Sequence, residues 1–292
     1  MDYLLHILVL VAICSILTVS LDLLVGHTGI LSVAQAAFYG LGAYSSALLS
    51  LRAGAPFIVG VLASMVMAIV ISLLLSVSSL RLQSDYFVLA SFGFQIIASS
   101  VFTNWQNLTG GPLGIVDIPQ PTLIGWKVCS NRGFALLCSI AAGFSFAIVR
   151  RITSSPFGRV LHAIREDEVL AEALGKNTLC FKIAAFGVSA ALAALAGGLY
   201  AHYVTYIDPT SFDVMESILI MAMVIIGGAG SFWGPVVGAA VLVGIPETLR
   251  FFGLPNAEVA NLREILYGSL IVIMMIVRPQ GLVGCYRFER GH

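Results

Sequence analysis

The ionisable side chains are few, and those in or near the apolar segments lie at the ends of these segments. Acids and bases inside a membrane normally mark ion or proton pathways, because they are costly in lipid. Here Asp22 lies near the end of the first apolar run and Asp85 at the start of another, while Asp213 and Glu216 resemble a capping pair that opens a run at 214. Charges in such places are typical of helix termini. They give little support to a carrier driven by protons or sodium, although backbone carbonyls can also coordinate sodium.

No motif of an enzyme or of a metal centre is found. The five cysteines form no C-x-x-C pair and no Cys/His set at metal-ligand spacing. Gly175-Lys176-Asn177 lacks the first glycine and the final hydroxyl of a phosphate-binding loop, and neither H-E-x-x-H nor G-x-S-x-G occurs. We therefore predict no catalytic, cofactor-binding or metal-binding residue. If transport by this protein consumes ATP, another chain must hydrolyse it.

The composition requires a membrane. Of 292 residues, 59% are hydrophobic and only 10% are charged, whereas a soluble domain is roughly half apolar and a quarter charged. This excludes a water-soluble globule. Fifteen basic and fifteen acidic residues give zero net charge, which removes the electrostatic argument for a nucleic-acid partner.

The apolar runs predict an all-α polytopic membrane protein of about 8–10 transmembrane helices, forming one domain over residues 1–292. A spanning helix needs about 20 apolar residues, and a strand of a membrane barrel would alternate apolar with polar residues, which the continuous runs do not. Nine runs are found. They fall at 3–25, 29–51, 57–77, 86–102, 133–149, 181–201, 214–227, 233–250 and 265–277.

The distribution of Lys and Arg predicts the orientation. With nine spans the linkers form two alternating sets, of which one holds ten basic residues and the other five; the richer set belongs in the cytoplasm. This places the C-terminus and the 150–182 loop inside, and the N-terminus and the 103–132 loop outside. One re-entrant segment counted as a span would invert the N-terminal side.

The two long loops differ in what they indicate. The 103–132 loop is polar and is either a docking or gate surface or a plain connector. In the 150–182 loop, Ser155-Pro156 starts a helix and Gly175 ends it. Its apolar stripe, including Leu161 and Ile164, needs a surface to cover it. The membrane face, the protein's own helix ends and a partner protein are all candidates.

Two glycine clusters interrupt apolar runs and indicate helix breaks or tight turns. They comprise Gly26 and Gly29, and Gly227, Gly228 and Gly230. Broken helices at membrane depth commonly accompany substrate paths, but spacing alone does not give their depth.

An ordered series of motifs gives a resemblance to a known family. The motifs are Gly29-Ile-Leu-Ser32 through Gly40-Leu-Gly42-Ala43-Tyr44, Leu80-Arg81 through Asp85-Tyr86-Phe87, Thr109-Gly110-Gly111-Pro-Leu-Gly114, Ser155-Pro-Phe-Gly158-Arg159, Gly227-Gly-Ala-Gly230-Ser-Phe-Trp-Gly234-Pro235 and Arg278-Pro279-Gln-Gly281-Leu282. In this series the chain resembles the M-type permease subunits of branched-chain amino acid ABC importers, from about residue 26 to 284.

The resemblance implies that the 155–175 segment is a coupling helix, which inserts into a cleft of the ATPase. The residues it assigns to ATPase coupling are Gly158, Arg159, Ile164, Arg165, Glu166, Glu172, Ala173 and Gly175. The helix after the first glycine break would lie close to the substrate path. The residues it offers as lining that path are Ser32, Gln35, Phe38 and Tyr44.

The resemblance also implies partners and a location. They are a second homologous permease subunit, two cytoplasmic ATP-binding subunits, an extracytoplasmic substrate-binding protein and the lipid bilayer of a bacterial inner membrane. ATP and Mg²⁺ would be bound by the ATPases, with no cofactor in this chain. Import of urea, short amides or other amino acids is the alternative within this class; a stand-alone secondary transporter or a membrane scaffold is the alternative outside it.

Overall fold

The computed structural model describes most of the chain. The described residues are 2–79, 84–123, 126–127, 131–251, 267–270, 272–274, 276 and 280–284. They form an α-helical bundle with one short hairpin, β1 (Thr122–Leu123) and β2 (Trp126–Lys127). The predicted all-α polytopic class is confirmed. Of the predicted span at 265–277, only 267–270, 272–274 and 276 are described, and all of these are helical.

Within the described part of the chain, five helices are long and apolar enough to cross a membrane. They are α1 (Asp2–Thr28), α3 (Phe57–Ser79), α4 (Ser84–Asn104), α6 (Asn131–Thr153) and α9 (Thr178–Val204). Three further helices are shorter, namely α2 (Gln35–Arg52), α10 (Val214–Gly227) and α11 (Gly234–Phe251). The smaller elements are α5 (Gln106–Thr109), η1 (Gly111–Leu113), α7 (Pro156–Glu166), α8 (Glu168–Ala173) and η2 (Pro209–Phe212).

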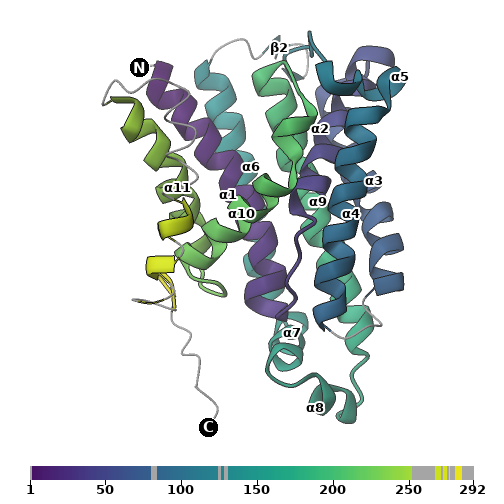
Figure 1. The fold of residues 1–292 in the computed structure, drawn as a ribbon, viewed down its shortest axis with the longest axis vertical. Helices are drawn as coiled ribbons and strands as arrows, with labels where there is room; N and C mark the ends of the chain where they lie inside the picture. The colour runs from purple at the N-terminus through teal and green to yellow at the C-terminus, as the bar shows by residue number, and fades with distance from the viewer. Residues whose placement is uncertain are drawn as a thin grey trace.

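The runs predicted at 29–51 and 214–227 are not whole spanning helices. Residues 29–34 are irregular, so α2 begins only at Gln35, about half-way along the bundle (Figure 1). Residues 205–213 contain only η2, and the 14 residues of α10 extend for about 21 Å at 1.5 Å per residue, short of the roughly 30 Å of a hydrocarbon core. Hydropathy alone cannot distinguish a full span from an irregular segment joined to a half-length helix.

The broken segments give the chain two similar units. In each, a helix of 27 residues, α1 or α9, leads into an irregular segment and then into a shorter helix, α2 or α10. The two units run in opposite directions, since α1 descends toward α7 in Figure 1 and α9 rises away from it. They also interlock, because α2 packs along α9 and α10 packs against α1.

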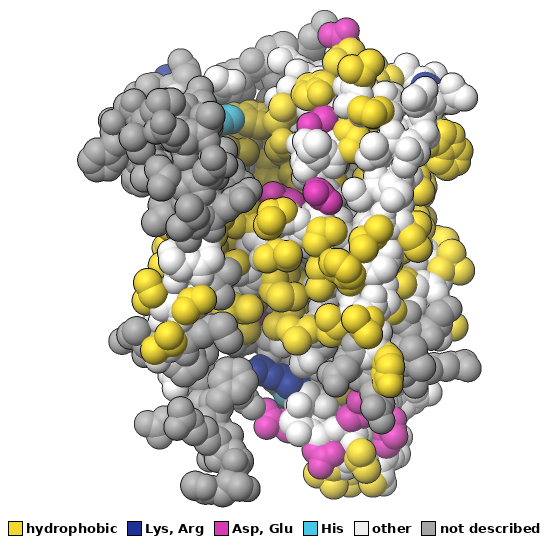
Figure 2. Space-filling model, in the orientation of Figure 1, with side chains coloured by type: hydrophobic (Ala, Val, Ile, Leu, Met, Phe, Trp, Pro, Cys, Tyr) yellow, Lys and Arg dark blue, Asp and Glu magenta, His cyan; other side chains and the backbone are white. Residues whose placement is uncertain are grey.

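The loops lie at opposite ends of the bundle. The start of α1, α5 and the β1–β2 hairpin are at one end, and α7 and α8 are at the other (Figure 1). This matches the relative placement expected for the 103–132 and 150–182 loops. Between the ends, hydrophobic side chains occupy much of the face shown in Figure 2, and only 28% of the residues in the most apolar windows of α3, α4 and α6 are buried inside the protein, as lipid contact requires.

Glycines allow α2 and α9 to touch backbone to backbone. A Cβ atom on Gly42 would lie 2.2 Å from the carbonyl oxygen of Ala194, and one on Gly197 would lie 2.0 Å from that of Tyr39. Close approach of this kind replaces the hydrophobic drive that is missing between helices in lipid. The small residues of this pair therefore hold the two units together.

We predict that Gly197→Ala destabilises the bundle by about 1–3 kcal/mol, because the added methyl group has to displace the α2 backbone. The apparent melting midpoint of the purified protein should fall, by roughly 2–4 °C for each kcal/mol lost. Gly187→Ala is the matched control on the same helix, since its Cβ would meet only Ser72 Oγ at 3.7 Å. Equal midpoints for the two variants would contradict the backbone contact.

Candidate functional site: the 150–182 loop and the broken helices

The 150–182 loop contains two short helices rather than the single helix predicted over 155–175. Ser155 caps α7 with its hydroxyl toward the Gly158 amide, and Pro156 occupies the first position. At Asp167 the backbone is extended, with φ −155° and ψ 105°. The Asp167 carboxylate accepts a hydrogen bond from the Leu170 amide at 2.9 Å and so caps α8. This cap is the reason that the helix stops and restarts.

The apolar stripe of α7 is covered by this protein's own helix ends. Leu161 and Ile164 are 0% and 4% exposed, and the ring of Phe157 lies 5.0 Å from that of Phe181 at the start of α9. The large apolar side chains of α8 and its C-cap are instead exposed. Val169, Leu170 and Leu174 are 76%, 57% and 71% exposed. The loop thus has one face anchored to the bundle and an apolar tip that remains uncovered.

Arg165 joins α7 to both broken units. Its guanidinium donates a hydrogen bond to the carbonyl oxygen of Gly26, near the end of α1. At the same place the Gly230 amide, in the turn between α10 and α11, donates to Asp22 Oδ1 at 2.7 Å. A Cβ atom on Gly26 would lie 2.3 Å from the Gly230 nitrogen. Three residues that the sequence placed in separate groups, Gly26, Arg165 and Gly230, therefore meet at one junction.

Two histidines complete this junction. His27 Nδ1 lies 3.0 Å from His162 Nε2 of α7, and His27 Nε2 lies 3.6 Å from Asp22 Oδ2. The pKa of His162 is lowered, first by burial and then by the Arg165 charge. A neutral His162 can share one proton with His27, whereas two imidazolium rings at this distance would repel each other.

The remaining glycines shape the turns around the junction. Helix α1 continues through Gly26 to Thr28, so Gly26 marks a close approach and the break starts at Gly29, which has φ +74°. Gly227 ends α10 and Gly228 has φ +111°. The amides of Leu282 and Val283 donate to Ile226 and Gly227 at 2.8 and 3.0 Å, so the 280–284 segment pairs with this turn.

The other predicted coupling residues fall into two groups. Some shape the loop: Glu172 Oε1 accepts from Thr178 Oγ1 at 2.7 Å, Gly175 has φ +78°, and a Cβ on Gly158 would lie 2.1 Å from the Thr153 oxygen. Others are exposed on its surface, namely Arg159, Glu166 and Ala173.

The predicted path residues are buried in helix contacts. Ser32, Gln35, Phe38 and Tyr44 are each at most 3% exposed. Gln35 bonds Ser20 Oγ at 2.5 Å, Phe38 packs on Phe94 and Phe186, and Tyr44 stacks on Phe102 with its hydroxyl buried. The neighbouring residue Tyr39, rather than any of these four, lines a cavity of about 440 Å³ between α1, α9 and α10.

The polar group that sequence reasoning missed is Gln95 of α4. Its Oε1 accepts the Ala37 amide at 2.7 Å and the Ser217 hydroxyl at 3.2 Å, and its Nε2 donates to the Phe212 carbonyl at 2.8 Å. Ser217 Oγ in turn accepts the Ala36 amide at 2.9 Å. Gln95 and Ser217 thus join the beginnings of α2 and α10. Their only sequence signal is that they are polar residues within apolar runs.

Comparisons with known proteins agree with this architecture. The family model described as branched-chain amino acid transport system / permease component matches residues 3–275. The high-affinity branched-chain amino acid transport system permease protein LivM of Escherichia coli K12 is 33% identical over 92% of this chain and 67% of its own length. LivH of Salmonella typhimurium is 27% identical over 66% of this chain and 64% of its own.

A more distant relative carries another cargo. The autoinducer 2 import system permease protein LsrC of Salmonella paratyphi B is 26% identical over 76% of this chain and 64% of its own length. No solved structure matches. The resemblance inferred from the ordered motifs is thereby confirmed at the level of the family.

We predict that Arg165→Met loosens α7, because the Gly26 carbonyl loses a charged donor worth about 1.5–3 kcal/mol. Amide hydrogen exchange over 156–166 should then be faster by roughly ten-fold or more. Arg159→Met is the control, since Arg159 is exposed on the same helix. If both variants exchange at the wild-type rate, Arg165 does not anchor the loop.

Proposed function

The chain belongs to the branched-chain amino acid transport permease family, and on that premise we propose that it is the membrane subunit of an ATP-driven, binding-protein-dependent importer of branched-chain amino acids. The observation that carries this proposal is the 150–182 loop, which is anchored at one junction to both broken units while its tip remains exposed. A loop of this construction can receive motion from outside the membrane and pass it to helices inside it.

The tip of the loop fits a protein partner. Val169, Leu170 and Leu174 are exposed apolar residues on α8 and at its end, and acidic side chains lie next to hydrophobic ones at this end of the molecule (Figure 2). A solvent-exposed cluster of this kind favours a partner with an apolar cleft and a basic rim. We assign this partner to the ATP-binding subunits, which bind ATP and Mg²⁺ and carry out hydrolysis, so that the tip lies in the cytoplasm.

The junction supplies the mechanical step. When the ATPase pair closes and moves α8, α7 moves as well, because Asp167 connects the two helices directly. The start of α9 also follows α8, because Lys182 Nζ of α9 binds Glu168 at 2.5 Å. Arg165 then pulls on the end of α1, and the contact between Gly26 and Gly230 carries the displacement to α10. The two units have opposite directions, so a shift at this end changes their angle and opens one side of the bundle.

The rest of the assembly follows from the proposed class. A second, homologous permease would pair with this one, as LivH and LivM are both permease proteins by name. An extracytoplasmic binding protein would deliver substrate at the end that carries α5 and the hairpin. The complex would lie in the inner membrane of a bacterium, with the C-terminus in the cytoplasm.

We predict that Val169→Asn and Leu174→Asn, made together, weaken ATPase binding by roughly ten-fold or more, because burial of each side chain contributes about 1.5–3 kcal/mol. Co-purification of the ATPase with the permease measures this. Leu113→Asn is the control, since Leu113 is 82% exposed but lies in η1 at the opposite end. Undiminished ATPase recovery with the double variant would rule out α8 as the docking tip.

The substrate is tested by reconstitution. We predict that proteoliposomes containing this chain, its partner permease, the ATPases and the binding protein accumulate leucine, isoleucine and valine only when ATP is present. The panel includes urea, short amides and other amino acids, since a relative such as LsrC imports a different cargo. If this chain alone takes up substrate without ATP, the protein is a secondary transporter and the proposed function is wrong.

A further inference from the structure

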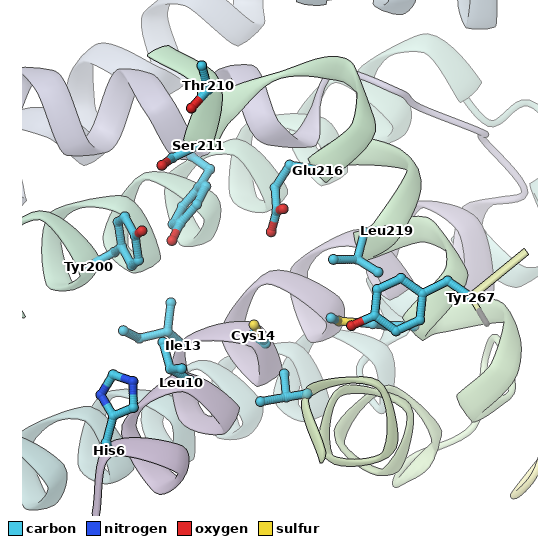
Figure 3. Close-up of a pocket in the computed structure, with 13 residues that line it drawn as sticks. His6, Leu10, Ile13, Cys14, Tyr200, Thr210, Ser211, Glu216, Leu219 and Tyr267 are labelled. Atoms are coloured by element: carbon cyan, nitrogen blue, oxygen red, sulfur yellow. The ribbon is translucent and has the colours of Figure 1, made fainter. Parts of the chain in front are cut away.

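A cavity toward the end of the bundle where α1 begins is separate from the junction at the α7 end. It has a volume of about 440 Å³, within the range of small-molecule sites. Its wall comes from both units and from two later segments (Figure 3). The lining residues are His6, Leu10, Ile13, Cys14, Tyr39, Tyr200, Thr210, Ser211, Glu216, Leu219, Met223, Val243 and Tyr267.

One end of the cavity is polar and acidic. Glu216 lies in the first turn of α10, and its carboxylate points into the cavity (Figure 3). Tyr39 and Tyr200 stand beside it with ring centroids 5.5 Å apart. Among the described lining residues there is no Lys or Arg. A carboxylate beside aromatic faces, with no Lys or Arg to pair with it, favours a cationic group, because both the charge and the ring quadrupoles attract it.

The other end is apolar. Leu10 and Ile13 of α1 face Leu219 and Met223 of α10, and Val243 of α11 closes this side. Leu219 and Met223 are 9% and 2% exposed, so they present only a small apolar surface to the cavity. A molecule that fits both ends carries an ammonium group on a short branched or linear hydrocarbon.

The cavity is connected to the movement of the helices. Glu216 precedes Ser217, whose hydroxyl accepts the Ala36 amide of α2 at 2.9 Å. Leu10 and Ile13 belong to α1, the helix that Arg165 holds at its far end. A change in the angle between α1 and α10 therefore alters the distance between the carboxylate and the apolar wall.

From these observations we propose that this cavity is a transit site that binds the ammonium group of a small apolar amino acid through Glu216, with the side chain between α1 and α10. The assignment rests on the proposed function, which it extends by naming a substrate group and its acceptor. No Lys or Arg lines the described wall, and Nδ1 of the lining residue His6 is hydrogen-bonded to the Tyr203 hydroxyl at 2.6 Å, so the substrate carboxylate contributes little. An amine that lacks the carboxylate, isopentylamine, should therefore bind at least as well as leucine.

The test measures binding of radiolabelled isopentylamine and leucine to the assembled importer in nanodiscs made without phosphatidylethanolamine. We expect Glu216→Gln to weaken binding of both by roughly ten-fold or more, the equivalent of a charge-assisted hydrogen bond. Asp213→Asn is the matched control. It removes a charge from the same helix end but keeps the cap on the Val214 amide, and Asp213 does not line the cavity. It should change affinity by no more than about two-fold, as exposed charges interact weakly.

Competition identifies the recognised group. Unlabelled isopentylamine should displace leucine, whereas 4-methylpentanoate, which has the same hydrocarbon but no amine, should not. Displacement by 4-methylpentanoate, or equal affinities of Glu216→Gln and Asp213→Asn, would overturn the proposal. Displacement by phosphatidylethanolamine but not by leucine would also overturn it, because the cavity would then hold a lipid headgroup.

A second variant keeps the test decisive if Glu216→Gln does not fold. Leu219→Phe narrows the apolar end and leaves the carboxylate in place, so leucine should lose affinity while ethylamine does not. The outcomes also separate this inference from the function. If the wild-type importer takes up leucine and neither variant changes ligand binding, the proposed transit site is rejected while the proposed function stands. The importer could instead bind amines through Glu216 without taking up leucine. That result would reject leucine as the substrate but would retain the amine-binding site.

Discussion

In lipid, a backbone amide or carbonyl that leaves a helix has to find another partner within the protein. This requirement controls the two irregular segments on which the structure depends. In 29–34, the Ile30 amide returns to the Leu24 carbonyl at 3.1 Å and the Val33 amide reaches Ser91 Oγ at 3.1 Å. In 205–213, Ile207 exchanges two backbone hydrogen bonds with Ile115. Each break is tolerated because another part of the chain is positioned to satisfy it.

The same requirement joins the two units at the start of α2 as well. The first amides of α2 have no partner within their own helix, and they are met by Ser217 of α10 and Gln95 of α4. Farther along, the Ser189 hydroxyl of α9 donates to the Ser20 carbonyl of α1 at 2.7 Å. Together with the junction at Gly26 and Gly230, these bonds connect the units at several depths. Motion at one end therefore changes the relation of α1 to α10 along their length.

Much of the fold could be predicted from the sequence, and different sequence signals predict its different features. The long helices follow from continuous apolar runs, and the seated helix α7 follows from its cap at Ser155 and its stripe through Leu161 and Ile164. The break at 29–34 was less accessible, because its residues, apart from Gly29 and Ser32, are as apolar as those of a helix. The polar segment 205–213 falls between two predicted runs, but its sequence does not show that the helix after it is only half a span. The role of Gln95 depends on contacts with residues more than fifty positions away in both directions, which no local pattern encodes.

The acidic residues show most clearly that a side chain's role cannot be predicted from its local sequence alone. Asp213 caps α10, as the capping pattern predicted, since its side chain accepts the Val214 amide at 2.7 Å. Glu216 belongs to the same pattern but lines a cavity instead, and Asp22, expected as a helix-terminus charge, is 2% exposed and holds the Gly230 amide. All three are carboxylates near a helix end, and that local position does not distinguish their roles. What it does is decided by the element that packs against it, so its function can be read only once the broken helices are placed.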